Sequence, residues 1–164
     1  MMITRLESTT DIITIFKEYL EYMSHYFVVN DHESWCKGAL KNLTKYSTDS
    51  DRHIYVVKES GFIIGFAFVN KHLRFNKDGF AVAEFYIQKA HVRKKTGSRL
   101  AEYVFEQFPG NWEVAVTSNN HSARIFWKQV VSSYTQEKYS EKVINAFDGC
   151  GLLFNNSSYV TVST

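Results

Sequence analysis

Four basic side chains surround one glycine at the junction between a predicted strand and a predicted helix. The strand spans Val82 to Gln88, the loop spans Lys89 to Gly97, and the helix starts at Ser98. The cations are Arg93, Lys94, Lys95 and Arg99. The first N–H groups of a helix lack acceptors within the helix, and the helix dipole makes the same end attractive to anions. The sequence therefore predicts a phosphate-binding site at this junction.

Hydrophobic periodicity predicts the elements that position this junction. A short strand over Ile3–Leu6 precedes a helix whose apolar stripe runs from Ile12 to Met23, and a second helix spans Glu33–Tyr46. Further strands are predicted over His53–Lys58, Phe62–Val69 and Trp112–Thr117, with one or two more after Tyr134. Asn120 is the predicted N-cap of the last helix. This order of elements predicts an α/β fold (α+β mixed) with a mixed β-sheet. We expect a single domain over residues 1–164.

The composition excludes several classes of protein. A hydrophobic content of 45% is far from that of a disordered chain, and a net charge of +2 is too small to favour nucleic acid as a partner. No apolar run is long enough to span a membrane, and the first residues do not resemble a signal peptide. Cys36 and Cys150 form no metal-type pair, and the six histidines show no ligand spacing. We therefore expect a cytoplasmic protein with no metal site.

Three further segments resemble one known family. They are Ala83-Glu84-Phe85, Phe108-Pro109-Gly110-Asn111-Trp112-Glu113-Val114, and Asn120-x-x-Ala123-x-x-x-Trp127. Together with the basic loop they resemble the GNAT superfamily of acetyl-CoA-dependent N-acetyltransferases, and in particular its small bacterial members. The resemblance implies a central twisted mixed β-sheet of about six or seven strands flanked by about four helices. It also implies acetyl-CoA (coenzyme A) as the cofactor.

The loop motif of this family, Gln/Arg-x-x-Gly-x-Gly/Ala, fits the basic loop in two registers. One register runs from Val92 to Gly97 and has Lys95 at the first glycine position. The other starts at Arg93 and has Thr96 there. We prefer the first, because it keeps a true glycine at the end of the motif. The resemblance implies that the pyrophosphate of coenzyme A is bound by Val92, Arg93, Lys94, Lys95, Thr96, Gly97 and Ser98.

The resemblance also assigns a place to the pantetheine arm of coenzyme A. It implies that the main chain around Tyr86 and Ile87 pairs with this arm, as an added strand would. It further implies that Asn120 forms a hydrogen bond to the arm and that Trp127 lines its channel. A helix N-cap role for Asn120 and plain core packing for Trp127 are the alternatives, and the sequence leaves both open.

Glu84 is the first candidate for the base that takes a proton from the amine, because similar enzymes often use a carboxylate near this strand. Strand alternation places Glu84 and Tyr86 on one face and Phe85 and Ile87 on the other. A structural or substrate-orienting role for Glu84 stays equally open. The expected donor to the developing oxyanion is a main-chain N–H of the same strand.

The general acid is less well defined. In many relatives a tyrosine at the position of Trp127 protonates the departing sulfur, and an indole does not do this. The acid is therefore Tyr86 or Tyr134, or the thiolate leaves to solvent. The aromatic residues Tyr19, Tyr22, Tyr26 and Phe27 of the first helix either line an acceptor pocket or pack in the core.

The predicted activity is transfer of an acetyl group from acetyl-CoA to a primary amine by direct attack on the thioester. The acceptor is a small-molecule or peptide amine, with no nucleic acid and no membrane as partner. The alternative is a catalytically weak or inactive acyl-CoA-binding regulatory module, favoured by Lys95 in the loop motif and by Trp127. A homodimer is the default expectation for a small enzyme.

Overall fold

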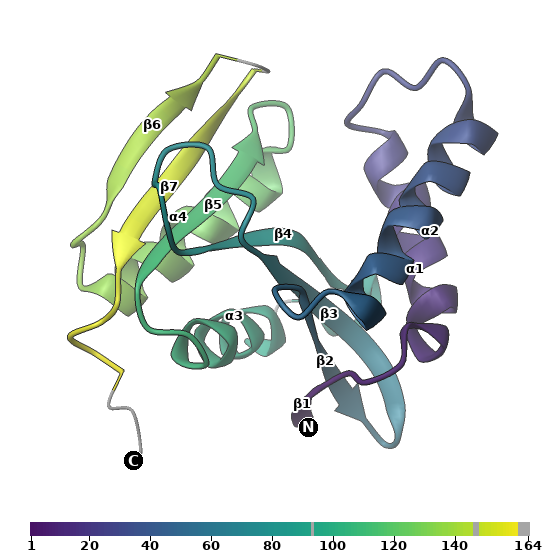
Figure 1. The fold of residues 1–164 in the computed structure, drawn as a ribbon, viewed down its shortest axis with the longest axis horizontal. Coiled ribbons are helices and arrows are strands. Elements are labelled where there is room, and N and C mark those ends of the chain that lie inside the picture. Colours follow the sequence, from purple (N-terminus) through teal and green to yellow (C-terminus); the bar gives the residue numbers. More distant parts are fainter. Residues whose placement is uncertain (93, 146–147, 161–164) are drawn as a thin grey trace.

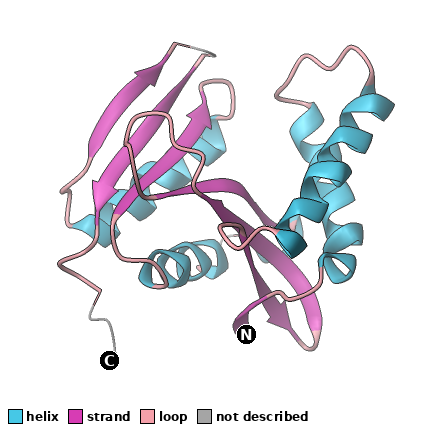
Figure 2. Ribbon diagram, in the orientation of Figure 1, coloured by secondary structure: helices cyan, strands magenta, loops and turns pink. Residues whose placement is uncertain are grey.

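One mixed β-sheet runs through the molecule (Figure 2). In the residues that this computed structural model describes (1–92, 94–145 and 148–160), seven strands lie in the order β1-β2-β3-β4-β5-β7-β6. Their bounds are Met2–Arg5 (β1), His53–Glu59 (β2), Phe62–Asn70 (β3), Phe80–Ile87 (β4), Asn111–Thr117 (β5), Ser140–Ile144 (β6) and Gly149–Asn155 (β7). Neighbouring strands are antiparallel, except that β4 and β5 are parallel.

Two pairs of helices cover opposite faces of this sheet (Figure 1). The α-helices are Ile13–Ser24 (α1), His32–Thr48 (α2), Thr96–Glu106 (α3) and His121–Thr135 (α4), and short 3-10 turns span Thr9–Ile12 and Lys89–His91. Helices α1 and α2 pack on the face that carries Phe66 and Phe68, whereas α3 and α4 pack on the other face. The mixed sheet of seven strands with four α-helices confirms the predicted architecture. Among the described residues, no helix is both long and apolar enough to cross a membrane.

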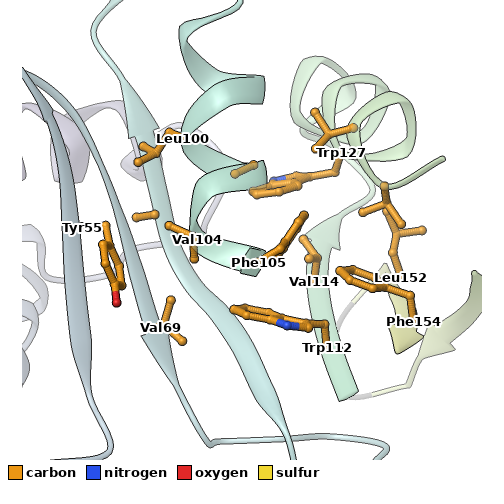
Figure 3. Packing of buried hydrophobic residues seen from close by; sticks show 14 of the residues in the cluster. Tyr55, Val69, Leu100, Val104, Phe105, Trp112, Val114, Trp127, Leu152 and Phe154 are labelled. Atoms are coloured by element: carbon orange, nitrogen blue, oxygen red, sulfur yellow. The ribbon is translucent and has the colours of Figure 1, made fainter. Parts of the chain in front are cut away.

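The helices form where the sequence repeats apolar residues at helical spacing. Helix α1 buries Ile15, Phe16, Tyr19 and Leu20, and α3 buries Thr96, Leu100, Ala101, Val104 and Phe105. Figure 3 shows Phe105 of α3 between Trp112 of β5 and Trp127 of α4. Phe105 meets Trp112 edge-on, with ring centroids 5.0 Å apart. This aromatic contact fixes α3 and α4 against β5, next to the predicted basic loop.

The connection between β3 and β4, residues 71–79, is anchored on β5 by one buried carboxylate. Glu113 is only 4% exposed and accepts hydrogen bonds from the N–H groups of Arg74, Phe75 and Asn76 at 2.6–2.9 Å. The ring of Phe75 also lies so close to Gly151 that a Cβ on this glycine would be 2.7 Å from it. The loop therefore has a fixed course over the face of β5 opposite to α4 (Figure 1).

Candidate active site

Strands β4 and β5 separate after three paired positions and leave a cleft between them. The parallel pairs are Phe80 with Trp112, Ala81 with Glu113 and Val82 with Val114, and among the described residues the pairing stops there. Figure 1 shows β4 turning away from β5 beyond this point. The resulting β4–β5 cleft, lined by residues of α1, α2, β4, β5, α4 and the start of α3, has a volume of about 1770 Å³. Its walls include the edge of β4 that pairs with no strand in the described part of the chain.

A β-bulge marks the place where β4 leaves β5. Phe68 of β3 pairs with Glu84, and the next residue, Val69, pairs with Val82. Ala83 is therefore an extra residue on β4, opposite no residue of its own on β3. A bulge bends its strand and increases the local twist, which explains why β4 diverges from β5 at this position.

The bulge also decides which side chains face α1. Before the bulge, Val82 packs against the part of the hydrophobic core that lies between the sheet and helices α3 and α4. After the bulge, Phe85 and Ile87 pack against the same part of the core. The even-numbered residues of β4 therefore change from one face of the sheet to the other at Ala83. Tyr86 packs against the part of the core that lies between the sheet and helices α1 and α2. Glu84 lies on the α1 side as well, because Tyr19 of α1 bonds to it. The predicted sharing of faces, Glu84 with Tyr86 and Phe85 with Ile87, is confirmed.

Glu84 is a buried carboxylate held by one hydroxyl group. The hydroxyl of Tyr19 donates a hydrogen bond to Glu84 Oε2. Burial raises the pKa of the Glu84 carboxyl, and the hydrogen bond from Tyr19 opposes this rise. Burial also raises the pKa of Tyr19, and the charge of Glu84 adds to it, so this phenol stays protonated. Glu84 lines the β4–β5 cleft and has the chemistry of a base whose pKa is shifted toward neutrality.

Tyr86 makes the reciprocal contact to helix α1. Its hydroxyl donates to Glu18 Oε1 at 2.7 Å, and Gln88 Nε2 donates to Glu18 Oε2 at 2.9 Å. Burial raises the pKa of Tyr86 first, and the hydrogen bond to Glu18 raises it further. A phenol with a raised pKa is a weaker acid, and its proton already has an acceptor. Tyr86 is therefore better suited to positioning α1 on β4 than to donating a proton.

The start of α3 places main-chain N–H groups at the end of the cleft, and these have no acceptor among the described residues. Lys95 is the N-cap and has a left-handed backbone, with φ 59° and ψ 8°. The first main-chain bond of the helix runs from Arg99 to Lys95 O. The N–H groups of Thr96, Gly97 and Ser98 therefore have no acceptor in the part of the chain that the structure describes. The helix begins two residues before the predicted start at Ser98, since the left-handed Lys95 already turns the chain into it.

The left-handed backbone at Lys95 bears on the register of the loop motif. Glycine adopts this conformation without steric cost, whereas other residues are strained in it. Lys95 occupies the first glycine position in the register from Val92 to Gly97, and this agrees with the register that we preferred. Val92, Lys95, Gly97 and Ser98 line the cleft, whereas Lys94 and Thr96 are not among its lining residues. Arg93, also predicted to bind the cofactor, lies outside the described residues.

Gly97 is packed against an aromatic ring of α4. A Cβ at this position would lie 3.0 Å from Phe126 Cε2 and 3.6 Å from Ile87 Cγ1. Phe126 is half-buried and also contacts Phe85 at a centroid distance of 5.5 Å. The small residue thus lets α3 approach β4 and α4 closely, so that its free N–H groups open into the cleft.

Asn120 and Trp127 both have structural roles and both line the cleft. The Asn120 side chain accepts from the N–H of Ala123 at 3.1 Å, which confirms the N-cap prediction, and its Nδ2 donates to the Tyr22 hydroxyl at 3.3 Å. Trp127 is 5% exposed and meets the Phe85 ring edge-on at 4.8 Å. The two alternatives that the sequence left open for Trp127, core packing and lining of the cleft, are therefore compatible.

Tyr134 is the candidate that the fold places elsewhere. Its ring packs against Phe105 and Phe154, and its hydroxyl lies 3.4 Å from Asn156 Nδ2. It is not among the residues that line the β4–β5 cleft. Tyr134 follows Trp127 by two turns of α4, and this spacing takes it away from the cleft into the core. The position of Tyr134 therefore gives no support to it as the acid.

Sequence reasoning missed Glu18 and the partner of Glu84. The sequence indicates only an acceptor-pocket or core role for Tyr19, and it gives no sign that Glu18 has a partner on β4. The three hydrogen bonds of Tyr19 and Glu18 to β4 and Gln88 join residues that are 65 to 70 positions apart in the chain. The helical spacing of α1 could show that Tyr19 faces inward, but no local signal indicates which strand residue it meets.

Comparison with known proteins agrees with this geometry. Residues 12–130 match the model of the family described as Acetyltransferase (GNAT) family. No protein with a curated description is similar enough in sequence to be matched. Among the described residues, no group of three or more His, Cys, Asp or Glu side chains is placed to hold a metal ion.

Several solved structures share the fold at low sequence identity. An acetyltransferase from Thermus thermophilus has a TM-score of 0.66 and 11% identity, over 94% of this chain and 97% of its own. The PaiA N-acetyltransferase from Thermoplasma acidophilum, in complex with coenzyme A, has a TM-score of 0.65 and 15% identity, over 94% and 99%. An acetyltransferase of the GNAT family from Staphylococcus aureus Mu50 has a TM-score of 0.63 and 13% identity, over 94% and 99%.

Proposed function

The chain belongs to the acetyltransferase (GNAT) family, and from this premise we propose that it moves an acetyl group from acetyl-CoA to a primary amine that enters the β4–β5 cleft. Members of this family are N-acetyltransferases and use acetyl-CoA as the acyl donor. The observation that carries the proposal is the buried Glu84 carboxylate, which lines the same cleft as the free N–H groups at the start of α3. In this proposal Glu84 takes a proton from the amine, and the N–H groups bind the acetyl-CoA.

The residues at the far end of the cleft fit a pyrophosphate. The N–H groups of Gly97 and Ser98 have no acceptor among the described residues, and Lys95 adds a cation at the cleft wall. Main-chain donors at a helix start hold phosphate oxygens, and a lysine strengthens them by charge. The unpaired edge of β4 supplies main-chain donors and acceptors to the amide groups of the pantetheine arm. We assign Lys94, Thr96 and Arg99 no direct contact.

Glu84 is the proposed base. An amine in water carries a proton and attacks only after losing it. Burial shifts the pKa of Glu84 upward, so that the carboxylate binds this proton more readily than an exposed glutamate would. The new N–C bond then forms as the C–S bond of the thioester breaks. Glu84 takes the first proton, which the ammonium group loses before the attack, and passes it to solvent. The nitrogen loses its second proton to solvent as the amide forms.

Two negative charges develop in the reaction, one on the thioester oxygen and one on the leaving sulfur. A main-chain N–H stabilises the first, and solvent stabilises the second. A main-chain N–H of β4 beyond its last pair with β5 donates to the oxygen that becomes negative. Trp127 has no ionisable proton, and the proton of Tyr86 is bound to Glu18. A thiol has a pKa of about 8.5, so the thiolate can leave to water without a general acid. Tyr86 then acts as a positioning residue.

Two measurements test this proposal. Acetyl-CoA at millimolar concentration should raise the melting temperature, whereas ADP, which lacks the pantetheine arm, should raise it less. Thiol release should rise when primary amines are added, and Glu84→Gln should lower it by a factor of about 10² to 10⁴. Glu106→Gln is a matched control, because this exposed glutamate of α3 is not among the cleft-lining residues. Full activity in the Glu84→Gln variant would remove Glu84 from the role of base.

A regulatory module with little turnover is the second candidate. Lys95 at a position where the family motif has glycine, and Trp127 at the position of the usual acid, favour it. The same assay distinguishes the two. Stabilisation by acetyl-CoA without thiol release for any amine would support the regulatory module and contradict an enzyme.

A further inference from the structure

Tyr22 of helix α1 spans the β4–β5 cleft. Its ring lies next to the ring of Tyr86 on β4, with centroids 5.8 Å apart, and its hydroxyl accepts a hydrogen bond from Asn120 Nδ2 at 3.3 Å. Asn120 follows β5 and caps α4, so the two contacts lie on opposite sides of the cleft. All three residues line it. Tyr22 is therefore held at both ends, and its ring forms part of the cleft wall.

A row of three tyrosine rings connects Tyr22 with the proposed base. The centroids of the Tyr86 and Tyr19 rings are 5.7 Å apart, and the Tyr19 hydroxyl donates to Glu84. Tyr86 follows Glu84 by two residues on the same face of β4, so their Cα atoms are about 7 Å apart. The rings of Tyr22 and Tyr86 are half-buried and line the cleft, so part of each is accessible from it. We call the rings of Tyr19, Tyr22 and Tyr86 the tyrosine wall.

The hydroxyl groups of the tyrosine wall all have partners within the chain. Those of Tyr19 and Tyr86 donate to carboxylates, and that of Tyr22 accepts from an amide. Because these groups are occupied, the wall offers a ligand the faces and edges of aromatic rings. Such rings pack favourably on another flat ring in offset or edge-on contact. The wall therefore favours an acceptor whose body is flat and apolar.

The carboxylates of α1 that line the cleft already have partners as well. Both oxygens of Glu18 accept hydrogen bonds from side chains at or just after the end of β4, at 2.7 and 2.9 Å. Glu21 lies 3.4 Å from the Nε2 of His32. A second ammonium group on the acceptor would have to compete with these partners, whereas a single one meets Glu84. The charges therefore suit an acceptor with one amine better than a polyamine.

On these grounds we propose that the acceptor is a primary amine joined by a short linker to an aromatic ring, and that Tyr22 selects for this ring. This inference rests on the proposed function. The ring of the acceptor packs against Tyr22 and Tyr86, and its amine reaches Glu84. A linker of about two carbons follows from the short separation of Glu84 and Tyr86 along β4. Because Tyr22 is held from both sides of the cleft, its ring loses little freedom when the acceptor binds.

The test compares three acceptors: phenethylamine, 2-cyclohexylethylamine and spermidine. The first two have the same two-carbon linker and differ in whether the ring is flat, and the third carries additional ammonium groups in place of a ring. In the wild type with acetyl-CoA, kcat/KM for thiol release should be highest with phenethylamine. In Tyr22→Leu, the ratio of kcat/KM for phenethylamine to that for 2-cyclohexylethylamine should fall about 3- to 10-fold, the range for loss of one aromatic pair.

Tyr22→Phe is the matched control, because it removes the hydroxyl and its bond to Asn120 but keeps the ring. Its ratio should stay within about twofold of the wild-type ratio. Tyr103→Leu makes the same kind of change on α3, at a residue that does not line the β4–β5 cleft, and should leave the ratio unchanged. Binding gives a second readout: in the presence of coenzyme A, calorimetry should detect phenethylamine with the wild type and Tyr22→Phe, and weaker or no binding with Tyr22→Leu.

Three results would overturn the inference. They are a higher kcat/KM for spermidine or 2-cyclohexylethylamine than for phenethylamine in the wild type, a wild-type ratio that persists in Tyr22→Leu, and absence of phenethylamine binding and turnover in a protein that acetyl-CoA stabilises. The first and third use only the wild type, so they do not depend on the folding of a variant. In each of these cases acetyl-CoA binding would still stand. Failure of acetyl-CoA itself to stabilise the protein would instead contradict the proposed function.

Discussion

Tyr19 of helix α1 donates its hydroxyl hydrogen bond to the carboxylate of Glu84 on strand β4. A second pair crosses the same contact in the opposite direction, from Tyr86 of β4 to Glu18 of α1. Each element thus supplies one donor and one acceptor, and α1 cannot slide along β4 without breaking both bonds. The pairing connects the position of α1 to the pKa of the proposed base.

Removal of the Tyr19 hydroxyl should shift the pH dependence of activity. The hydrogen bond favours the ionised form of Glu84 and lowers its pKa, so Tyr19→Phe should raise this pKa further. The base is active when ionised, and the acidic limb of the kcat/KM profile should therefore move to higher pH. Activity above this limb should be largely retained. A pH–rate profile of the variant measures the shift.

Tyr55→Phe is the control for this variant, because Tyr55 packs on the α3–α4 side of the sheet. Its profile should coincide with that of the wild type. An acidic limb that stays in place in Tyr19→Phe would show that the hydroxyl does not act on the titrating group.

Glu84→Gln should make the protein more stable at neutral pH while it impairs the reaction. Burial raises the folded-state pKa of Glu84 above its ordinary value of 4.5. The stability that this group contributes is therefore complete below pH 4.5 and is lost as the pH rises through the folded-state pKa. Glutamine has no charge to bury, and Tyr19 can still donate to its amide oxygen.

Thermal unfolding of the wild type and Glu84→Gln between about pH 4 and pH 8 measures this effect. The melting temperature of the variant should exceed that of the wild type at the upper end of the range, and the difference should shrink toward the lower end. A variant that is less stable than the wild type at the upper end would contradict the sign of the shift.

Replacement of Lys95 by glycine should leave the protein more stable than replacement by alanine. The left-handed backbone of Lys95 costs a non-glycine residue roughly 1–2 kcal/mol. Lys95→Gly relieves this cost, whereas Lys95→Ala keeps it, and both remove the charge. Urea denaturation should therefore find Lys95→Gly about 1 kcal/mol more stable than Lys95→Ala.

The two Lys95 variants also separate strain from charge in coenzyme A binding. Both should bind coenzyme A more weakly than the wild type, with a smaller dependence on salt, because the cation at the cleft wall is gone. If both bound it as tightly as the wild type, the lysine charge would have no part in the site.

Glu113→Ala should detach the loop over β5. The change leaves three main-chain N–H groups without their acceptor in a largely buried place. Each such loss costs about 1–3 kcal/mol, and we expect the free energy of unfolding to fall by at least about 2 kcal/mol. Chemical denaturation measures it. Glu141→Ala, which breaks surface ion pairs to Arg124 and Lys128, should cost less than about 1 kcal/mol. Equal costs for the two would disagree with the anchoring role.

Local sequence patterns predicted most of the fold. The apolar stripe of α1, the strand pattern of β2 and β3, and the N-cap of α4 at Asn120 all follow from near neighbours in the chain, and the structure has each of them. The order of these elements was enough to expect the mixed sheet. Boundaries were less exact, as at the start of α3, where the conformation of Lys95 has no signature in its residue type.

The sequence by itself determined which chemical groups the protein has and which short elements carry them: a basic loop before a helix, and Glu84 and Tyr86 on one strand. The tertiary structure alone decided which groups meet. Four features depend on contacts between distant parts of the chain. They are the extra residue at Ala83, the separation of β4 from β5, the Tyr19–Glu84 hydrogen bond and the anchoring of Arg74 by Glu113. Periodicity reports the face that a residue presents within its own element. The partner on that face is fixed only when the elements pack together, and burial then sets the pKa of the carboxylate.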